Sequence, residues 1–345
     1  MSAAVDTSIT PDASARRRKQ SYWRIVLRQY RGNVLGIAAF LLLVLFGAVA
    51  LFAPFIAAGA PFYLVMDGNT YVFPNILDYA DLRGFQFDRW QPRENDVALW
   101  PPVPFDPNRS DLRNRLAPPD RVHWLGTDDR GRDVLSRLVW GSRVSISIGF
   151  VAVGISLAIG VVLGSIAGYY GGVIDSIILR LIEIVLTFPT FFLILAVIAF
   201  LPPSIYSIMI VIGLLGWTGI ARLVRGEFLK LRDSDFCTAA RASGLSDARI
   251  IFRHLLPNAL TPVWVSATFG VAGAILVESS LSFLGFGPPP PTPSWGEILA
   301  QSQSYLHRGA WWLVVYPGLA IFVTVTAFNL VGEGLRDAMD PRLRQ

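Results

Sequence analysis

Long runs of apolar residues without a charge constrain this chain more strongly than any other feature of its sequence. No Asp, Glu, Lys or Arg occurs in 144–170, and none occurs in 184–221. A helix needs about 20 apolar residues to cross the hydrocarbon core of a bilayer, where only a helix or a closed barrel satisfies its own backbone. A soluble domain carries roughly 25% charged residues, whereas this chain has 16%. The sequence therefore predicts a membrane protein with several spanning helices.

Six apolar segments are long enough to span a bilayer, so we expect an all-α membrane protein with six transmembrane helices. These spans are expected to cover 34–52, 144–170, 177–201, 205–223, 259–283 and 311–332. The first apolar core is longer than that of a signal peptide, so we expect it to remain as a span. Small residues within the second span favour close contact between helices in lipid, as at Gly154, Gly160, Gly164 and Gly168.

Positive charge beside the spans predicts their orientation, because short cytoplasmic flanks carry an excess of Lys and Arg. The arm 1–33, the segment 225–258 and the tail 336–345 are all basic, so both termini are expected in the cytoplasm. The stretch 54–143 is also rich in arginine, but loops of this length translocate largely regardless of charge, so it is expected outside. Basic flanks explain the net charge of +5 better than a nucleic-acid-binding stripe does.

The expected organisation follows from these boundaries. A basic arm (1–33) and the first span (34–53) precede an outer insertion with an amphipathic surface helix (54–143). A five-helix core (144–335) contains the segment 225–258, and the tail is 336–345. The insertion has enough aromatic residues to form a small packed lobe or to sit at headgroup level, and a structural cap is favoured over substrate contact. Its surface helix is expected to expose charges satisfied locally or by water, namely Asp128, Asp129, Arg130, Arg132, Asp133 and Arg137.

The segment after the fourth span has the pattern of a helix, a turn and a second helix. Asp233 or Ser234 is expected to cap the first helix, and Gly244 to end it in a left-handed conformation. Ser246 and Asp247 begin the second helix, and Pro257 is expected to limit it at its end. Alanines keep the first helix slim enough for another protein to approach, with Arg241 and Arg249 at the rim. The residues alone fit equally well a docking element or an amphipathic connector on the membrane.

Charged and aromatic residues near the membrane surface are the remaining candidates. Arg180 and Glu183 are spaced to pair on one helix face. Glu278 stands alone near the outer end of the fifth span, where we favour structural pairing over ion transport. The proline run 288–291 is a stiff spacer that is expected to hold Trp295 over a pore mouth, with Phe283 nearby.

The chain lacks the residues that several classes of protein need for their function. Cys237 is the one cysteine, and the histidines (His123, His254 and His307) lie far apart, so we expect no disulfide within the chain, no metal site and no cofactor. Neither Lys19 nor Lys230 follows a P-loop spacing, so ATP hydrolysis is not expected here. A proton-coupled secondary transporter is the main alternative, but it would need acids or histidines in mid-span and an internal repeat. An intramembrane hydrolase lacks a recognisable nucleophile or zinc motif.

Three stretches resemble one family. The pattern Thr238-Ala239-Ala240, Gly244 and Leu256-Pro257 is similar to the EAA loop of ABC importer permeases, with threonine at the glutamate position. Residues 125–143 and 278–296 resemble the C-type permease subunit of dipeptide, oligopeptide and nickel importers. The insertion 63–104 is similar to the E-type permease of Yej importers, which take up peptides and peptide-like antibiotics.

The resemblance implies a type I ABC importer permease fold in the bacterial inner membrane, with a periplasmic insertion between the first two spans. It implies transport of oligopeptides or peptide-like compounds by alternating access, without enzymatic activity of its own. The implied partners are a homologous second permease in a heterodimer, one or two ATP-hydrolysing nucleotide-binding subunits, a periplasmic or extracellular peptide-binding protein and lipid, with no nucleic acid. The residues implied to couple to the ATPase are Thr238, Ala239, Ala240, Arg241, Gly244, Leu256 and Pro257, and those implied at the pore mouth are Glu278, Phe283 and Trp295.

Overall fold

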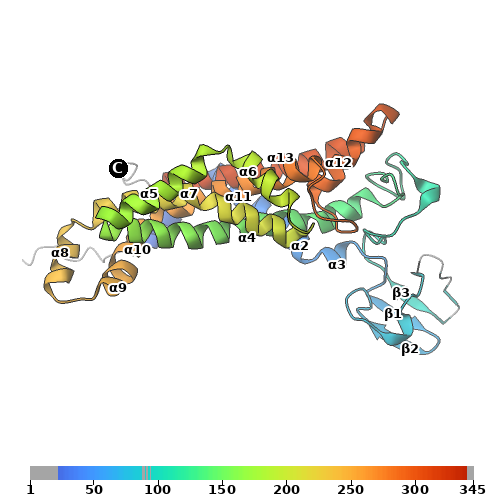
Figure 1. Ribbon diagram of the computed structural model, residues 1–345. Helices are drawn as coiled ribbons and strands as arrows, with labels where there is room; N and C mark the ends of the chain where they lie inside the picture. Colours follow the sequence, from blue (N-terminus) through green and yellow to red (C-terminus); the bar gives the residue numbers. More distant parts are fainter. Residues whose placement is uncertain (1–21, 88–89, 91, 94, 340–345) are drawn as a thin grey trace, which may run out of the picture.

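The computed structural model is an elongated helical bundle with a small lobe at one end and a short helical segment at the other (Figure 1). It describes residues 22–87, 90, 92–93 and 95–339. The basic residues expected to orient the arm at 16–19, and those of the tail at 342 and 344, lie outside the described residues. The statements below concern the described part of the chain.

Five helices are long and apolar enough to cross a membrane, and a bent pair provides a sixth crossing if it is counted as one span. The five are α2 (Val34–Leu51), α4 (Val134–Tyr170), α7 (Ile205–Leu231), α11 (Thr261–Phe283) and α13 (Trp312–Met339). The bent pair consists of α5 (Gly172–Thr187) and α6 (Thr190–Ala199). The shorter helices are α1 (Tyr22–Tyr30), α3 (Ala53–Ile56), α8 (Asp235–Ala242), α9 (Asp247–Arg249), α10 (Leu256–Ala259) and α12 (Trp295–Tyr305).

The third expected span, 177–201, is not one straight helix. Its two halves meet at an angle of 80°, and Phe188 between them is extended, with φ −97° and ψ 137°. Proline disfavours helical backbone at the residue before it and has no N–H for the helix ladder, so Pro189 accounts for the break. The sequence contained this signal, but the unbroken apolar run outweighed it in the prediction.

Helices α4 and α7 pack closely along their C-terminal halves because glycines of α4 leave room for the facing chain. A Cβ at Gly164 would lie 2.5 Å from the carbonyl oxygen of Ala221, and one at Gly168 would lie 2.5 Å from Cβ of Phe228. Gly160 is equally crowded by Ile220. The packing role predicted for these glycines is confirmed, whereas Gly154 has no atom within 4 Å of an added Cβ.

The insertion after the first span contains a small antiparallel sheet, which was not expected from the sequence. Its strands are β1 (Tyr63–Met66), β2 (Asn69–Val72) and β3 (Val97–Leu99), in the order β2-β1-β3. Tyr63 is opposite both Val72 and Leu99. Leu64 and Tyr71 are buried, so the insertion has a packed interior of its own. The membrane-crossing part is all-α, as expected.

The amphipathic surface helix expected before residue 144 does not form as a separate element. Residues 126–133 form a loop, and α4 begins at Val134 and continues without interruption to Tyr170. Asp133 caps α4, because its side chain accepts a hydrogen bond from the backbone N–H of Ser136 at 2.7 Å. The second span therefore extends well beyond its apolar part.

Candidate functional site

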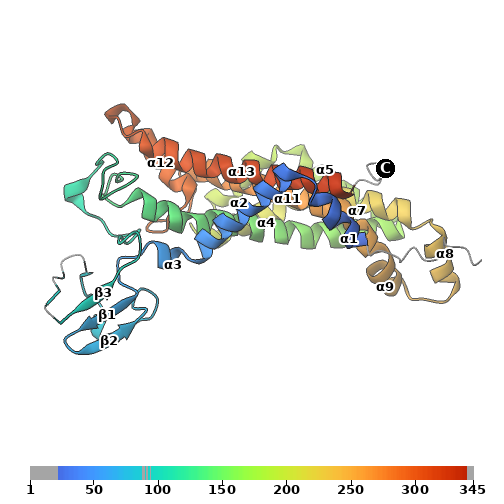
Figure 2. The same ribbon diagram turned by 180° about the vertical axis from the view of Figure 1, so that it is seen from behind.

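The helix–glycine–helix segment (235–258) lies at the end of the bundle opposite the lobe, beyond the C-terminal ends of α4 and α7 (Figures 1 and 2). Helix α8 ends at Ala242, and Gly244 follows with φ +73°, the left-handed conformation expected of it. Ser234 occupies the N-cap position of α8. Helix α9 then leads into a π-helical stretch, Ile250–Leu255.

Pro257 does not end the second helix as expected. It lies in the first turn of α10, where a missing N–H costs little, and helical backbone continues into α11. The carbonyl oxygen of His254 accepts a hydrogen bond from Nδ2 of Asn258 at 2.7 Å. The wider π-helical turn at 250–255 thus allows the helical backbone to continue through Pro257. The segment is therefore joined directly to the spanning helix α11.

The alanines of α8 do not share one exposed face. Ala240 and Cys237 are buried against Ile250 and Leu255, in a cluster that also contains Phe228 of α7. The expectation that Ala240 faces a partner is therefore wrong, because it packs within this chain. The outward side of α8 presents Phe236, Thr238, Ala239, Arg241 and Ala242. Apart from Phe236 and Arg241, the side chains on this side are small.

Polar contacts of Tyr169 connect the segment to the C-terminal end of α4. The hydroxyl of Tyr169 donates a hydrogen bond to Oδ1 of Asp247 at 2.6 Å. The guanidinium carbon of Arg241 lies 5.4 Å from the centre of the Tyr169 ring, within the range of a cation–π contact. Tyr169 therefore contacts residues on both sides of Gly244.

A second polar contact binds α5 to α7 near the same end. Nε and Nη2 of Arg225 donate to the two carboxylate oxygens of Asp175, in a bidentate pair. None of Tyr169, Asp175 and Arg225 was a candidate from the sequence, because their spacing along the chain gives no indication of contact. Arg180 and Glu183 do pair at 2.9 Å as predicted, but both side chains are largely exposed.

A hollow of about 260 Å³ opens between α4, α6, α7 and α11. Small residues line much of it, and Gly219 and Gly273 have open space where a side chain would project. Ser156 on α4 and Thr190 on α6 contribute hydroxyls. A wall of this kind leaves room for solutes of varied shape. The sequence analysis interpreted such small residues only as packing positions.

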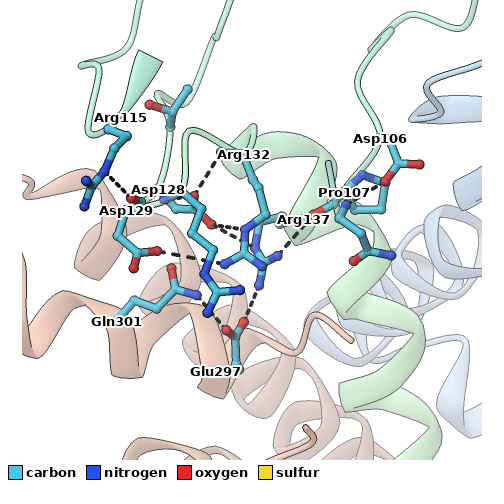
Figure 3. A network of polar contacts seen from close by, with 12 residues as sticks. Asp106, Pro107, Arg115, Asp128, Asp129, Arg132, Arg137, Glu297 and Gln301 are labelled. Carbon is cyan, nitrogen blue, oxygen red and sulfur yellow. Dashed lines mark hydrogen bonds and ion pairs between the residues drawn. The ribbon is translucent and has the colours of Figure 1, made fainter. Parts of the chain in front are cut away.

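A buried charge network occupies the N-terminal end of α4 (Figure 3). Arg137 is fully buried and forms ion pairs with Glu297 of α12 and, at 3.5 Å, with Asp128. Nε of Arg132 lies 2.6 Å from Oδ2 of Asp128. Arg137 also donates to the carbonyl oxygen of Pro107 at 3.1 Å. The expectation that these charges lie exposed on a surface helix is wrong for Asp128, Arg132 and Arg137, which are buried. Asp128 and Arg132 do pair locally, as expected, whereas Arg137 connects α4 to α12 and to the loops that contain Pro107 and Asp128.

Two of the three expected pore-mouth residues are buried. Glu278 is fully buried, with Oε1 accepting from the hydroxyl of Ser282 at 2.8 Å, and Ser145 and Ser279 are 3.4 Å from Oε2. Trp295 donates through Nε1 to the carbonyl oxygen of Leu138 at 3.0 Å. Both side chains join α4, α11 and α12 rather than facing an opening. Phe283 is partly exposed.

These spans define a multi-pass membrane protein with a helical segment at one end and a folded lobe at the other. The chain belongs to the family described as binding-protein-dependent transport system inner membrane component, whose model matches residues 160–345. A second model, the N-terminal TM domain of oligopeptide transport permease C, matches residues 21–74.

Curated relatives agree with this family. The chain is 45% identical over 231 residues to the dipeptide transport system permease protein DppC of Alkalihalophilus pseudofirmus, covering 67% of this chain and 76% of the relative. It is 42% identical to DppC of Haemophilus influenzae, covering 70% and 84%. It is 38% identical to the oligopeptide transport system permease protein OppC of Bacillus subtilis, covering 72% and 82%. This chain is therefore an inner-membrane permease subunit of an ABC importer and not an enzyme, so the secondary-transporter and hydrolase alternatives fall away.

Proposed function

We propose that this permease carries oligopeptides or peptide-like compounds into the cytoplasm together with a homologous second permease. The names of its relatives, which are dipeptide and oligopeptide permeases, support this cargo. A soluble peptide-binding protein would deliver the cargo to the side of the lobe. Nucleotide-binding subunits would bind the helix–glycine–helix segment at the other end, through the outward side of α8.

The continuity of α4 is the observation that carries this proposal. One uninterrupted helix, Val134–Tyr170, ends at the Tyr169 contacts to the helix–glycine–helix segment and begins at the buried network of Arg137. A displacement of the segment by an ATPase would therefore act on α4 directly. Because α7 is interlocked with α4 through Gly160, Gly164 and Gly168, the two helices would move together.

The hollow between α4, α6, α7 and α11 is the proposed wall of the transport path. Two of its four helices are α4 and α7, so their movement would change its shape. Glycines and hydroxyls would allow peptides with different side chains to pass without a tight, specific site. Alternating access then consists of opening this wall first to one side of the membrane and then to the other.

Reconstitution tests the proposal. The complex with its second permease, nucleotide-binding subunits and binding protein is placed in proteoliposomes with ATP, and imported peptides are identified by mass spectrometry. We expect peptide uptake that needs both ATP and the binding protein. Binding-protein-dependent uptake of only a non-peptide solute would refute the peptide assignment but leave the family unaffected.

A further inference from the structure

The outer lobe (57–103) carries an apolar surface that no described part of the chain covers. The turn 73–77 after β2 exposes Phe73, Ile76 and Leu77, with 43%, 50% and 53% of their surface accessible. Three large apolar side chains within five residues are unusual on a water-exposed loop. The turn therefore requires a covering partner.

This turn is tied to the end of a membrane-spanning helix. Nδ2 of Asn75 donates to the carbonyl oxygen of Pro54 at 2.7 Å. The ring of Phe55 contacts the ring of Phe73, with centroids 5.6 Å apart, and also that of Phe52, at 6.3 Å. Helix α2 ends at Leu51. The turn thus lies beside the end of the spanning helix α2.

The apolar surface of the turn continues the lipid-facing surface of α2. Only 17% of the 18 residues of α2 are buried within the chain, which identifies it as a peripheral helix of the bundle. Leu51 and Phe52 at its end are more than half exposed. The lobe extends sideways past the bundle beside α3 in both views, so it overhangs the region that lipid would occupy around α2 (Figures 1 and 2).

One face of the sheet adds to this surface. Tyr63, Val72 and Leu99 are paired across the three strands and share a face, since opposite residues point to the same side. All three are exposed, whereas Leu64 and Tyr71 on the other face are buried. Aromatic residues beside aliphatic ones are typical of the membrane–water interface.

We propose that the outer lobe binds the lipid surface of the leaflet at which α2 ends, with Phe73, Ile76 and Leu77 entering the headgroup layer. Lipid is favoured over a protein partner because the exposed turn is continuous with a lipid-facing helix. The lobe is then an anchor that holds the outer end of α2 at a fixed depth. This inference rests on the membrane location of the chain and not on its cargo.

A fluorescent probe tests the contact. Leu77→Cys is labelled with the environment-sensitive dye NBD in the assembled importer, in nanodiscs of phosphatidylethanolamine and phosphatidylglycerol without binding protein. Cys237 is buried, so unsubstituted protein serves as the labelling blank. Asn69→Cys, at the exposed hairpin tip of the same lobe, is the matched control. Ile76→Cys provides a second position.

We expect emission at shorter wavelength at positions 77 and 76 than at 69, and quenching by lipids brominated near the headgroup at the first two positions only. Water-like emission without quenching at both 76 and 77 would overturn the proposal. A shift that occurs only after the binding protein is added would also overturn it, in favour of a protein partner.

Discussion

The hydroxyl of Tyr169 donates to Oδ1 of Asp247 at 2.6 Å, so the last turn of α4 is bonded to the second half of the helix–glycine–helix segment. Arg241 from the first half lies over the ring of the same tyrosine. One side chain thus connects both halves of the proposed ATPase contact to the longest helix of the bundle. Five predictions test this contact and the other features described above.

Removing this hydroxyl should weaken coupling without removing either partner. Tyr169→Phe keeps the ring beneath Arg241 but deletes the hydrogen bond to Asp247, and hydrogen bonds to charged groups contribute about 1.5–3 kcal/mol. We expect ATP hydrolysis to continue while peptide imported per ATP falls severalfold. The ratio is measured in proteoliposomes. Tyr170→Phe, at the exposed neighbouring tyrosine, is the control, and equal ratios in both variants would contradict the role of this contact.

The outward side of α8 should bind the nucleotide-binding subunits. Ala239 is exposed, so Ala239→Arg adds bulk and charge there without disturbing the core, and we expect loss of copurifying ATPase from an otherwise intact membrane subunit. Gly244→Val should act similarly, because a β-branched residue at φ +73° costs roughly 1–2 kcal/mol and reorients α9. Arg308→Ala on the outer side is the control. If both variants copurify with a normal amount of ATPase, the segment only connects two spans and does not bind the nucleotide-binding subunits.

Ala240 permits a sharper distinction within the same helix. Because its side chain is buried against Ile250 and Leu255, Ala240→Arg should lower the thermal stability of the permease itself, whereas Ala239→Arg should not. The comparison is made by thermal unfolding in detergent. Equal stability of the two variants would show that α8 is not packed as described.

The buried network of Arg137 should contribute strongly to the stability of the outer end. Arg137→Ala deprives Glu297 of its ion pair, while Asp128 keeps its pair with Arg132 at 2.6 Å, and breaking a buried ion pair costs about 3–5 kcal/mol. The matched control is Arg83→Ala, which removes an exposed pair with Asp78 and should change stability by less than about 1 kcal/mol. Unfolding of the purified variants is followed by intrinsic tryptophan fluorescence, and similar losses in both would disprove the distinction.

The orientation of the chain remains a prediction that labelling can test. Ala80→Cys in the lobe and Ala239→Cys in α8 are both exposed, while Cys237 is buried. A membrane-impermeant maleimide added outside spheroplasts should label position 80 and not 239. Labelling at 239 before permeabilisation would invert the proposed topology.

Much of the membrane architecture was predictable, because crossing a bilayer imposes a minimum apolar length that can be read from residue types alone. The spans beginning at Val34 and Ile205 start where predicted. Gly244 was predictable for a related local reason, since a left-handed residue after a short helix favours glycine. The length of an apolar segment and the conformation of a single turn depend on residues close together in the sequence, so both can be predicted from it.

What the sequence could not reveal depends on residues far apart along the chain. Arg137 and Glu297 are separated by 160 positions, so nothing near either residue indicates that its charge is buried and paired. The inward orientation of Ala240 likewise depends on Ile250 folding back after Gly244. The sheet was missed because strands of three and four residues carry too little alternation to stand out from an irregular loop.

The uninterrupted length of α4 has a mechanical consequence. A 37-residue helix measures about 55 Å at 1.5 Å per residue, which exceeds the hydrocarbon thickness of a bilayer of about 30 Å. Part of α4 must therefore lie beyond the lipid, and close contacts with α7 run along it from Ile155 to Gly168. A stiff rod fastened along its length does not bend at any one point, so a push at Tyr169 would reach Arg137 as a displacement of the whole rod together with α7.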